Sequence, residues 1–130
     1  MSALEKVKGY LAELGYAITS ENTAEEIVVI DDESQGIKNL IIDCEAPILI
    51  LEQHIFNLKN ADAAVYKRLL QINRTLVHGA FVLDDSGERV LFRDTLQLAN
   101  LDLNELEGSI NALSLAMAEH AQELIKFATV

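Results

Sequence analysis

Residues 80–94 read AFVLDDSGERVLFRD, and this stretch decides the fold. Two strand-like runs, Ala80 to Leu83 and Glu88 to Asp94, flank the turn-forming sequence Asp84-Asp85-Ser86-Gly87. Gly87 can adopt the positive φ that tight hairpin turns require. The stretch therefore predicts a β-hairpin, and with it an antiparallel sheet.

A helix is predicted directly before the hairpin, from Asp62 to about Val77, with Asn60 or Asp62 as its N-cap. The residues expected to share one face of this helix are Tyr66, Leu69, Leu70, Asn73, Leu76 and Val77. His78-Gly79 follows, and glycine commonly ends a helix because it can take a left-handed conformation.

Four short runs of β-branched residues lie earlier in the chain. They predict strands at residues 16–20, 26–31, 37–43 and 47–56. Turn-forming residues at 21–23, 32–36 and 45–47 separate the runs, and such short connections favour an antiparallel meander. Residues 27–30 and 48–51 are apolar on both faces, which predicts cover on both sides of the sheet or from a second subunit.

Two further helices are expected at the two ends of the chain. Residues 2–14 place Leu4, Val7, Leu11 and Leu14 on one face, and Gly15 follows as a stop signal. The last helix begins at Asp102, which with Glu105 matches the capping-box pattern. Its apolar stripe comprises Leu103, Leu106, Ile110, Leu113, Met117, Ala121, Leu124 and Ala128, widened by Leu115 and Ile125. At about 26 residues it spans roughly 39 Å, enough to pack on a partner as well as on its own sheet.

The predicted order is helix, antiparallel strands, helix, β-hairpin and long C-terminal helix. This order is typical of an α+β sandwich, with one sheet and its helices packed mainly on one face. Since 130 residues fit one hydrophobic core, we expect a single domain over residues 1–130.

The chain carries 21 acidic and 10 basic side chains, a formal charge of −11. This charge would repel phosphate backbones and anionic lipid, so neither nucleic acid nor a membrane is an expected partner. Residues 21–52 hold nine acidic residues and one basic residue, Lys38. This concentration serves solubility, or it steers a basic segment of a partner toward the protein.

The first residues form neither a signal-peptide pattern nor part of a long apolar run, so a cytoplasmic location is expected. Cys44 is the single cysteine and lies between Asp43 and Glu45 in an apolar run, which predicts a structural thiol with a raised pKa.

No catalytic, cofactor or metal site is predicted. The sequence contains no G-x-S-x-G elbow, no P-loop and no G-x-G-x-x-G fingerprint. His54, His78 and His120 are too far apart in the sequence for a local metal motif, and the clustered carboxylates lie in predicted turns. A non-enzymatic protein is therefore expected.

Residues 66–76, YKRLLQINRTL, together with HGAFVLD at 78–84 and RDTLQL at 93–98, resemble the YbjN family and the type III secretion chaperones. The resemblance implies a secretion-chaperone-like α/β sandwich in a small, acidic homodimer. It also implies that an unfolded segment of a client protein is held against the sheet and the first helix, by strand addition and apolar grooves.

Two sets of residues are candidates for such contacts. Tyr66, Leu69, Leu70 and Asn73 are the candidates for a dimer interface, although ordinary core packing is the favoured interpretation. Leu4, Val7 and Leu11 are the candidates for a partner groove, although packing beneath the first helix is favoured. The predicted function is a protein-binding module, chaperone-like or a regulatory adaptor. A small-ligand-sensing regulator of the YbjN type is the second hypothesis.

Overall fold

The structure is a computed structural model that describes residues 2–58 and 63–128. Its helices are α1 (Ala3–Leu14), α2 (Ala63–Asn73) and α3 (Leu103–Ala128), with one turn of 3-10 helix, η1 (Glu33–Gln35). Its strands are β1 (Ile18–Asn22), β2 (Ile27–Asp32), β3 (Ile37–Glu45), β4 (Ile48–Asn57), β5 (Ala80–Leu83) and β6 (Arg89–Gln97). The predicted order of elements and the α+β class are confirmed.

The six strands form one sheet in the order β1-β2-β3-β4-β6-β5, and every neighbouring pair is antiparallel. The predicted hairpin is present, since β5 pairs with β6 and Phe81 lies opposite Phe92. The longest pairing joins β4 to β6, two strands separated in the sequence by α2 and β5. The hairpin is therefore attached to the meander through β6, and β5 becomes an edge strand.

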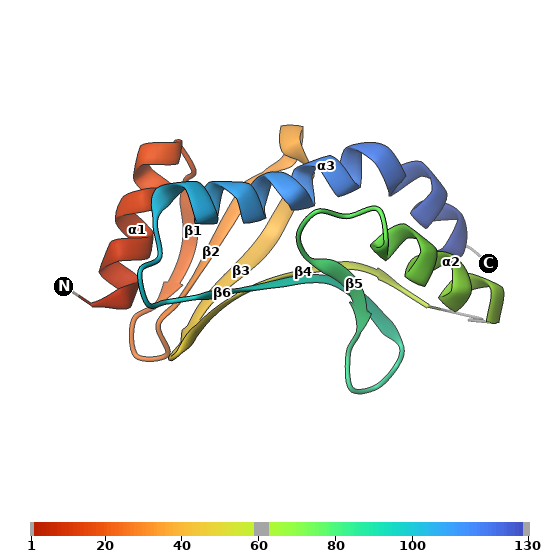
Figure 1. Cartoon of the computed structure of the whole chain (residues 1–130), viewed down its shortest axis with the longest axis horizontal. Coiled ribbons are helices and arrows are strands. Elements are labelled where there is room, and N and C mark those ends of the chain that lie inside the picture. Colours follow the sequence, from red (N-terminus) through yellow and green to blue (C-terminus); the bar gives the residue numbers. More distant parts are fainter. Residues whose placement is uncertain (1, 59–62, 129–130) are drawn as a thin grey trace.

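All three helices lie on one side of the sheet, and α3 runs along its length (Figure 1). Side chains from this side of the sheet and from the helices form the core, including Val28, Ile30, Leu49, Phe92 and Leu113. The loop between β5 and β6 projects from the opposite side (Figure 1). The sheet thus has one face covered by helices and one face open.

The helix ends follow the capping chemistry expected from the sequence. The Asp102 carboxylate accepts a hydrogen bond from the Glu105 N–H at 2.8 Å, as predicted for the start of α3. Ser2 caps α1 in the same manner, and Gly15 ends α1 in the left-handed conformation with φ 84°. These bonds satisfy backbone groups that a helix end leaves unpaired.

Some predicted boundaries were wrong. The first strand begins at Ile18 rather than Tyr16, and Glu21 and Asn22 extend it instead of forming a turn. Glu21 lies opposite Val28 of β2 in the strand pairing, and its carboxylate also forms an ion pair with the Lys8 ammonium of α1, with N and O 3.0 Å apart. The turn lies further on and ends at Glu26, which has a positive φ of 56°.

The second helix ends at Asn73, four residues before the predicted end, and the proposed caps Asn60 and Asp62 lie outside the described residues. Leu76 and Val77 are consequently not on its face. On α3, the predicted widening of the apolar stripe was wrong, since Leu115 is 55% exposed and Ile125 is 61% exposed.

Candidate functional site

Side chains along β3 alternate between the side of the sheet that the helices cover and the side that they leave uncovered. Leu40, Ile42 and Cys44 are buried beneath the helices. Ile41 and Asp43 point the opposite way, because successive side chains on a strand alternate between faces. Ile41 is 42% exposed, a large value for isoleucine in an inner strand.

Cross-strand pairing shows which side chains surround these two. Ile27 of β2 and Ile50 of β4 lie opposite Asp43, on either side of it. Val29 and Glu52 flank Ile41 in the same way, and Ile48 lies opposite Glu45. We call this surface the open face, and its members are Ile27, Val29, Ile41, Asp43, Ile48 and Ile50.

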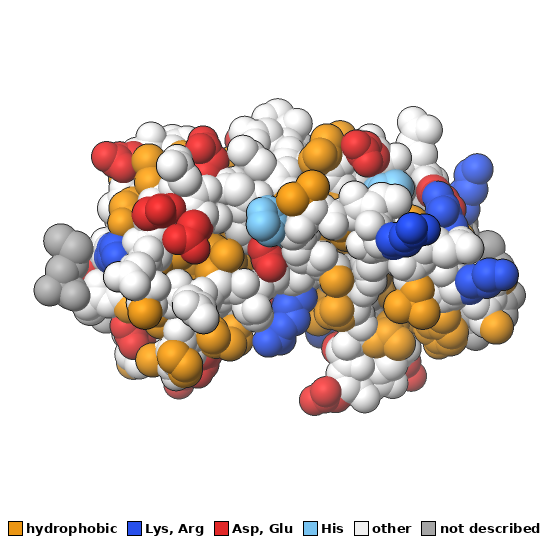
Figure 2. Space-filling view, in the orientation of Figure 1, with side chains coloured by type: hydrophobic (Ala, Val, Ile, Leu, Met, Phe, Trp, Pro, Cys, Tyr) orange, Lys and Arg blue, Asp and Glu red, His pale blue; other side chains and the backbone are white. Residues whose placement is uncertain are grey.

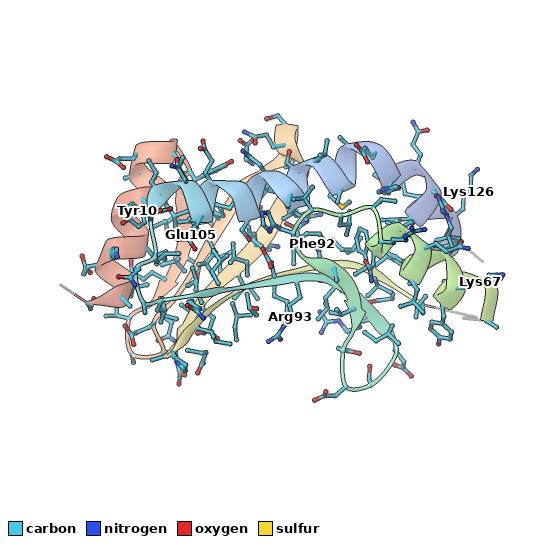
Figure 3. The ribbon with its side chains drawn as sticks, in the orientation of Figure 1. Tyr10, Lys67, Phe92, Arg93, Glu105 and Lys126 are labelled. Carbon is cyan, nitrogen blue, oxygen red and sulfur yellow. The ribbon has the colours of Figure 1, made fainter. Side chains whose placement is uncertain are left out.

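Arg93 of β6 borders the open face and points away from α3 (Figure 3). Its guanidinium forms an ion pair with the Glu52 carboxylate, with N and O 3.1 Å apart. Arg93 thus balances the negative charge of Glu52. Asp43 forms no such ion pair within the residues that the structure describes.

Asp43 is an unusual group for the centre of an aliphatic surface. Its Oδ1 atom is buried and has no hydrogen-bond partner within residues 2–58 and 63–128. Burial raises the pKa of the Asp43 carboxyl, and the negative charges of Glu45, Glu25 and Glu52 raise it further. The open face therefore holds a carboxylate in an environment that disfavours its charge.

A second surface lies at the other end of the sheet, between α2 and the edge strand β5. It is a groove of about 370 Å³, which we call the α2–β5 groove, lined by Tyr66, Leu69, Leu70, Phe81, Val82 and Leu83. Leu70 is 70% exposed and Leu83 is 43% exposed. Hydrophobic side chains gather over this region in the space-filling view (Figure 2).

Of the four residues expected at a dimer interface, three line this groove, and Leu69 is mostly buried at its base. Asn73 has a different position. Its amide Nδ2 donates to the Phe81 carbonyl at 3.0 Å, and its Oδ1 accepts from the Phe81 N–H at 2.7 Å. Asn73 therefore occupies the free edge of β5 as a pairing strand would, and its contacts are internal.

Leu4, Val7 and Leu11 are only 2%, 0% and 0% exposed, respectively. These three side chains of α1 pack in the core of the described chain. They do not line an accessible groove, because they are enclosed by other core residues of the same chain. Here the structure favours the packing alternative.

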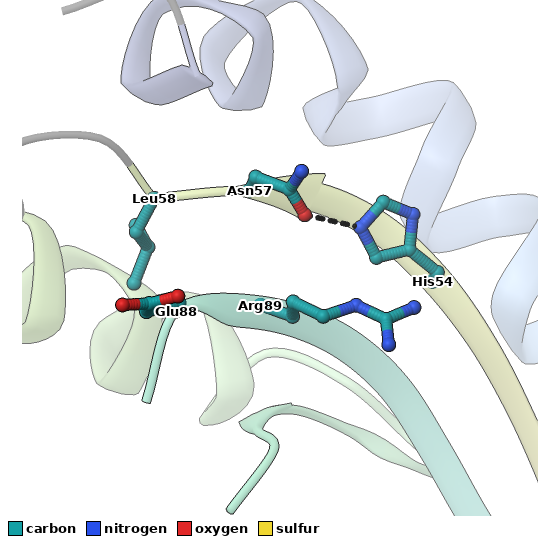
Figure 4. Close-up of a pocket in the computed structure, with 5 residues that line it drawn as sticks. All are labelled: His54, Asn57, Leu58, Glu88 and Arg89. Carbon is teal, nitrogen blue, oxygen red and sulfur yellow. Dashed lines mark hydrogen bonds between the residues drawn. The ribbon is translucent and has the colours of Figure 1, made fainter. Parts of the chain in front are cut away.

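A polar depression of about 420 Å³ lies where β4 ends and β6 begins, and it is lined by His54, Asn57, Leu58, Glu88 and Arg89 (Figure 4). A His54 ring nitrogen lies 2.8 Å from the Asn57 amide oxygen. Glu52, two residues from His54, instead pairs with Arg93. His54 thus contacts an amide and not an acid or a nucleophile, so the arrangement lacks the paired groups of a nucleophilic or acid–base site.

The thiol of Cys44 has neither the exposure nor the lowered pKa that a reactive cysteine requires. Cys44 is buried, and burial, aided by the charges of Glu26 and Asp43, raises the pKa of its thiol to about 11. No group of three or more His, Cys, Asp or Glu side chains in the described ranges is arranged to hold a metal ion. Nor does any helix within those ranges have the length and apolarity to cross a membrane.

The sequence predicted cover on both sides of the sheet for residues 27–30 and 48–51, or cover from a second subunit, whereas the helices of this chain cover one side only (Figure 1). It did not single out Asp43 or indicate which side stays open. A signal was available, since Asp43 and Ile41 are two residues apart within a predicted strand and so share a face. Which face the helices cover depends on long-range packing, and the local pattern does not specify it.

The family follows from comparison with known proteins. The CesT_Tir_1 family model, which describes type III chaperones, matches residues 1–130. The chain belongs to the CesT_Tir_1 family. No curated protein matches the sequence.

Solved structures resemble this CesT_Tir_1 chain in fold. YbjN from E. coli is 14% identical with a TM-score of 0.71, and the match covers 93% of this chain and 92% of that one. A chain of the ExsC–ExsE complex is 23% identical with a TM-score of 0.66, covering 95% and 96%. A chain of the heterodimeric ExoU–SpcU complex, from the type III secretion system of Pseudomonas aeruginosa, is 17% identical with a TM-score of 0.65, covering 94% and 97%.

Proposed function

We propose that this protein is a non-enzymatic, chaperone-like binding module that holds a segment of another protein on its open face. The observation that carries the proposal is the group of five aliphatic side chains on the uncovered side of the sheet. They are Ile27, Val29, Ile41, Ile48 and Ile50. Ile41 is exposed and the other four are half-buried, and a group of aliphatic side chains left uncovered on a folded protein is typical of an interaction site.

The edge of the sheet adds a second means of contact. β1 pairs with β2 on one side only, and residues 19–22 of this strand are exposed. An extended segment that pairs with β1 would gain main-chain hydrogen bonds there, and the chain that continues from this segment would be positioned to cross the open face. The other edge is less suitable, since the Asn73 amide already bonds the Phe81 backbone.

The comparisons support a protein-binding role. The ExsC–ExsE and ExoU–SpcU structures are complexes between two proteins, and a chaperone–effector complex, HopA1–SchA, has the same fold with a TM-score of 0.65. We propose the cytoplasm as the place of action, in keeping with the acidic charge and the free thiol of Cys44.

A photo-crosslinking experiment tests the proposed site. Benzoylphenylalanine placed at Ile41 on the open face is expected to crosslink a partner in cells that express the protein. The same group at Leu115, an exposed position on the opposite side of the sheet, is the matched control. Equal crosslinking at both positions, or none at Ile41, would contradict binding at the open face.

We also propose that two copies associate through the α2–β5 groove. Tyr66, Leu70 and Leu83 are exposed there and would bury apolar surface against the same residues of a second copy. Light scattering is expected to give a dimer that Leu70→Glu converts to a monomer, while Leu115→Glu leaves it intact. A wild-type monomer would refute this association.

A small-ligand-sensing regulator is the alternative function, and the apolar α2–β5 groove is the observation that favours it. Its volume of about 370 Å³ lies within the range of small-molecule sites. A ligand present at a hundred times its dissociation constant would stabilise the fold by about 2.7 kcal/mol, which a thermal-shift screen with metabolites detects. A stabilising metabolite whose effect is lost in Leu70→Glu would support this alternative.

A further inference from the structure

The open face contains a carboxylate, Asp43, among side chains that are otherwise aliphatic. Asp43 lies between Ile27 and Ile50 in the cross-strand direction, and Ile41 lies two residues away on the same strand. Its buried Oδ1 atom lacks a hydrogen-bond partner among the described residues. A partner that covered this face with aliphatic side chains alone would enclose an uncompensated carboxylate, which is strongly unfavourable.

The charges near Asp43 do not relieve this cost. The groups that influence it electrostatically are the carboxylates of Glu45, Glu25 and Glu52. Arg93, the cation that borders the open face, already pairs with Glu52. The missing element is a positive charge supplied from outside.

We propose that the open face binds an extended protein segment in which a lysine or arginine is flanked by apolar side chains, with the cation against Asp43. The apolar side chains of the segment contact Ile27, Ile41 and Ile50. This inference rests on the proposed function and adds the chemistry of the partner. Charge complementarity argues for this occupant, because a cation beside the Asp43 carboxylate balances a negative charge that is surrounded by the acidic groups Glu45, Glu25 and Glu52.

The acidity of the surrounding strands supports the same partner. Residues 21–52, which include β2, β3 and the first half of β4, hold nine acidic residues and one basic residue. Lysine and arginine side chains gather instead near α2 and the end of α3, where Lys67 and Lys126 lie (Figures 2 and 3). A basic segment is therefore attracted to the end of the molecule that carries the open face.

Fluorescence anisotropy with short labelled peptides tests the inference at low ionic strength. The probe peptide contains the core Ile-Thr-Lys-Thr-Ile, which places its lysine and both isoleucines on one side of an extended chain. Two matched peptides replace the lysine with glutamine or glutamate. Wild-type protein is expected to bind the lysine peptide about tenfold more tightly than the glutamine peptide, a common effect of one charge-assisted hydrogen bond.

Asp43→Asn is expected to abolish this preference and to leave affinity for the glutamine peptide unchanged. Asp85→Asn, an exposed position in the hairpin turn, is the control and is expected to keep the preference. Ile41→Glu is expected to weaken binding of the lysine and glutamine peptides alike, because it places a charge among the apolar contacts.

The outcomes separate the inference from the proposed function. Equal binding of lysine and glutamine peptides, both weakened by Ile41→Glu, would overturn the cationic anchor and leave the open face as a protein-binding site. Absence of binding by every peptide would overturn both. Conversion of a wild-type dimer to a monomer by Ile41→Glu would assign the open face to a second copy and overturn the inference as well.

Discussion

The side-chain amide of Asn73 forms two hydrogen bonds with the backbone of Phe81, one donated and one accepted, at 3.0 and 2.7 Å. The last residue of α2 thereby pairs with the edge strand β5 across eight positions of sequence. Phe81 in turn packs edge-to-face against Phe92 of β6, with ring centroids 5.7 Å apart. The end of the helix, the edge of the sheet and the core are fixed together at this point.

Replacement of Asn73 by alanine is expected to lower the free energy of unfolding by about 2 kcal/mol, because the Phe81 N–H and carbonyl lose their partners. Urea denaturation measures the change. Gln71→Ala, an exposed position on the same helix, is the control and is expected to change stability by less than about 0.5 kcal/mol. Similar effects of the two substitutions would show that the Asn73 bonds contribute little.

Two glycines are expected to respond in opposite directions to alanine. Gly79 has φ +75°, and a Cβ there would overlap the Phe92 ring, so Gly79→Ala should destabilise the fold by about 2–3 kcal/mol. Gly9 lies inside α1 with open space around it, so Gly9→Ala should stabilise by about 0.5–1 kcal/mol. Thermal melts of the two variants beside wild type provide the measurement. A stabilising Gly79→Ala would be incompatible with the described geometry.

The stability of the protein is expected to depend on the charge of Asp43. Because burial and neighbouring carboxylates raise the pKa of Asp43 above the ordinary value of 3.8, the folded state binds this proton more tightly than the unfolded state does. The stabilising contribution is full below pH 3.8 and is lost as the pH rises through the folded-state pKa. Asp43→Asn should therefore be more stable than wild type at pH 7, with the difference shrinking toward pH 3.5.

Urea denaturation at pH 7, 5 and 3.5 measures this dependence, with Asp85→Asn as the control in the exposed hairpin turn. A less stable Asp43→Asn variant at pH 7 would mean that the carboxylate has a favourable partner in the folded protein.

Cys44 is expected to resist alkylation in the folded protein. Its thiol has a pKa of about 11 and the residue is 6% exposed, so at pH 8 roughly one thiol in a thousand is ionised. Labelling with iodoacetamide should be at least a hundredfold slower in buffer than in denaturant at the same pH. Comparable rates in the two conditions would place the thiol at the surface.

Local signals in the sequence predicted much of the fold. The hairpin around Gly87, the cap at Asp102 and the stop at Gly15 each depend on residues a few positions apart, and all three are present. The order of elements followed from the same signals.

The features that the sequence did not predict depend on contacts between residues far apart in the chain. The end of α2 was misplaced because Leu76 and Val77 continue the apolar spacing, whereas the backbone leaves the helix at Asn73. The pairing of β4 with β6 and the side of the sheet that the helices cover arise from packing between segments far apart in the sequence. The open face, and the position of Asp43 on it, could therefore be identified only from the structure. Three of the four residues that the sequence suggested for an interface line the α2–β5 groove.

The strand order has a consequence for how strongly a client is held. The open face lies on β2, β3 and β4, whereas the groove lies between α2 and the edge strand β5, so the two surfaces share no residue. A pair of copies joined at their grooves would keep both open faces unoccupied. A single client with two basic, apolar segments on a linker of suitable length would then bind the second face intramolecularly, and two weak contacts would yield a long-lived complex.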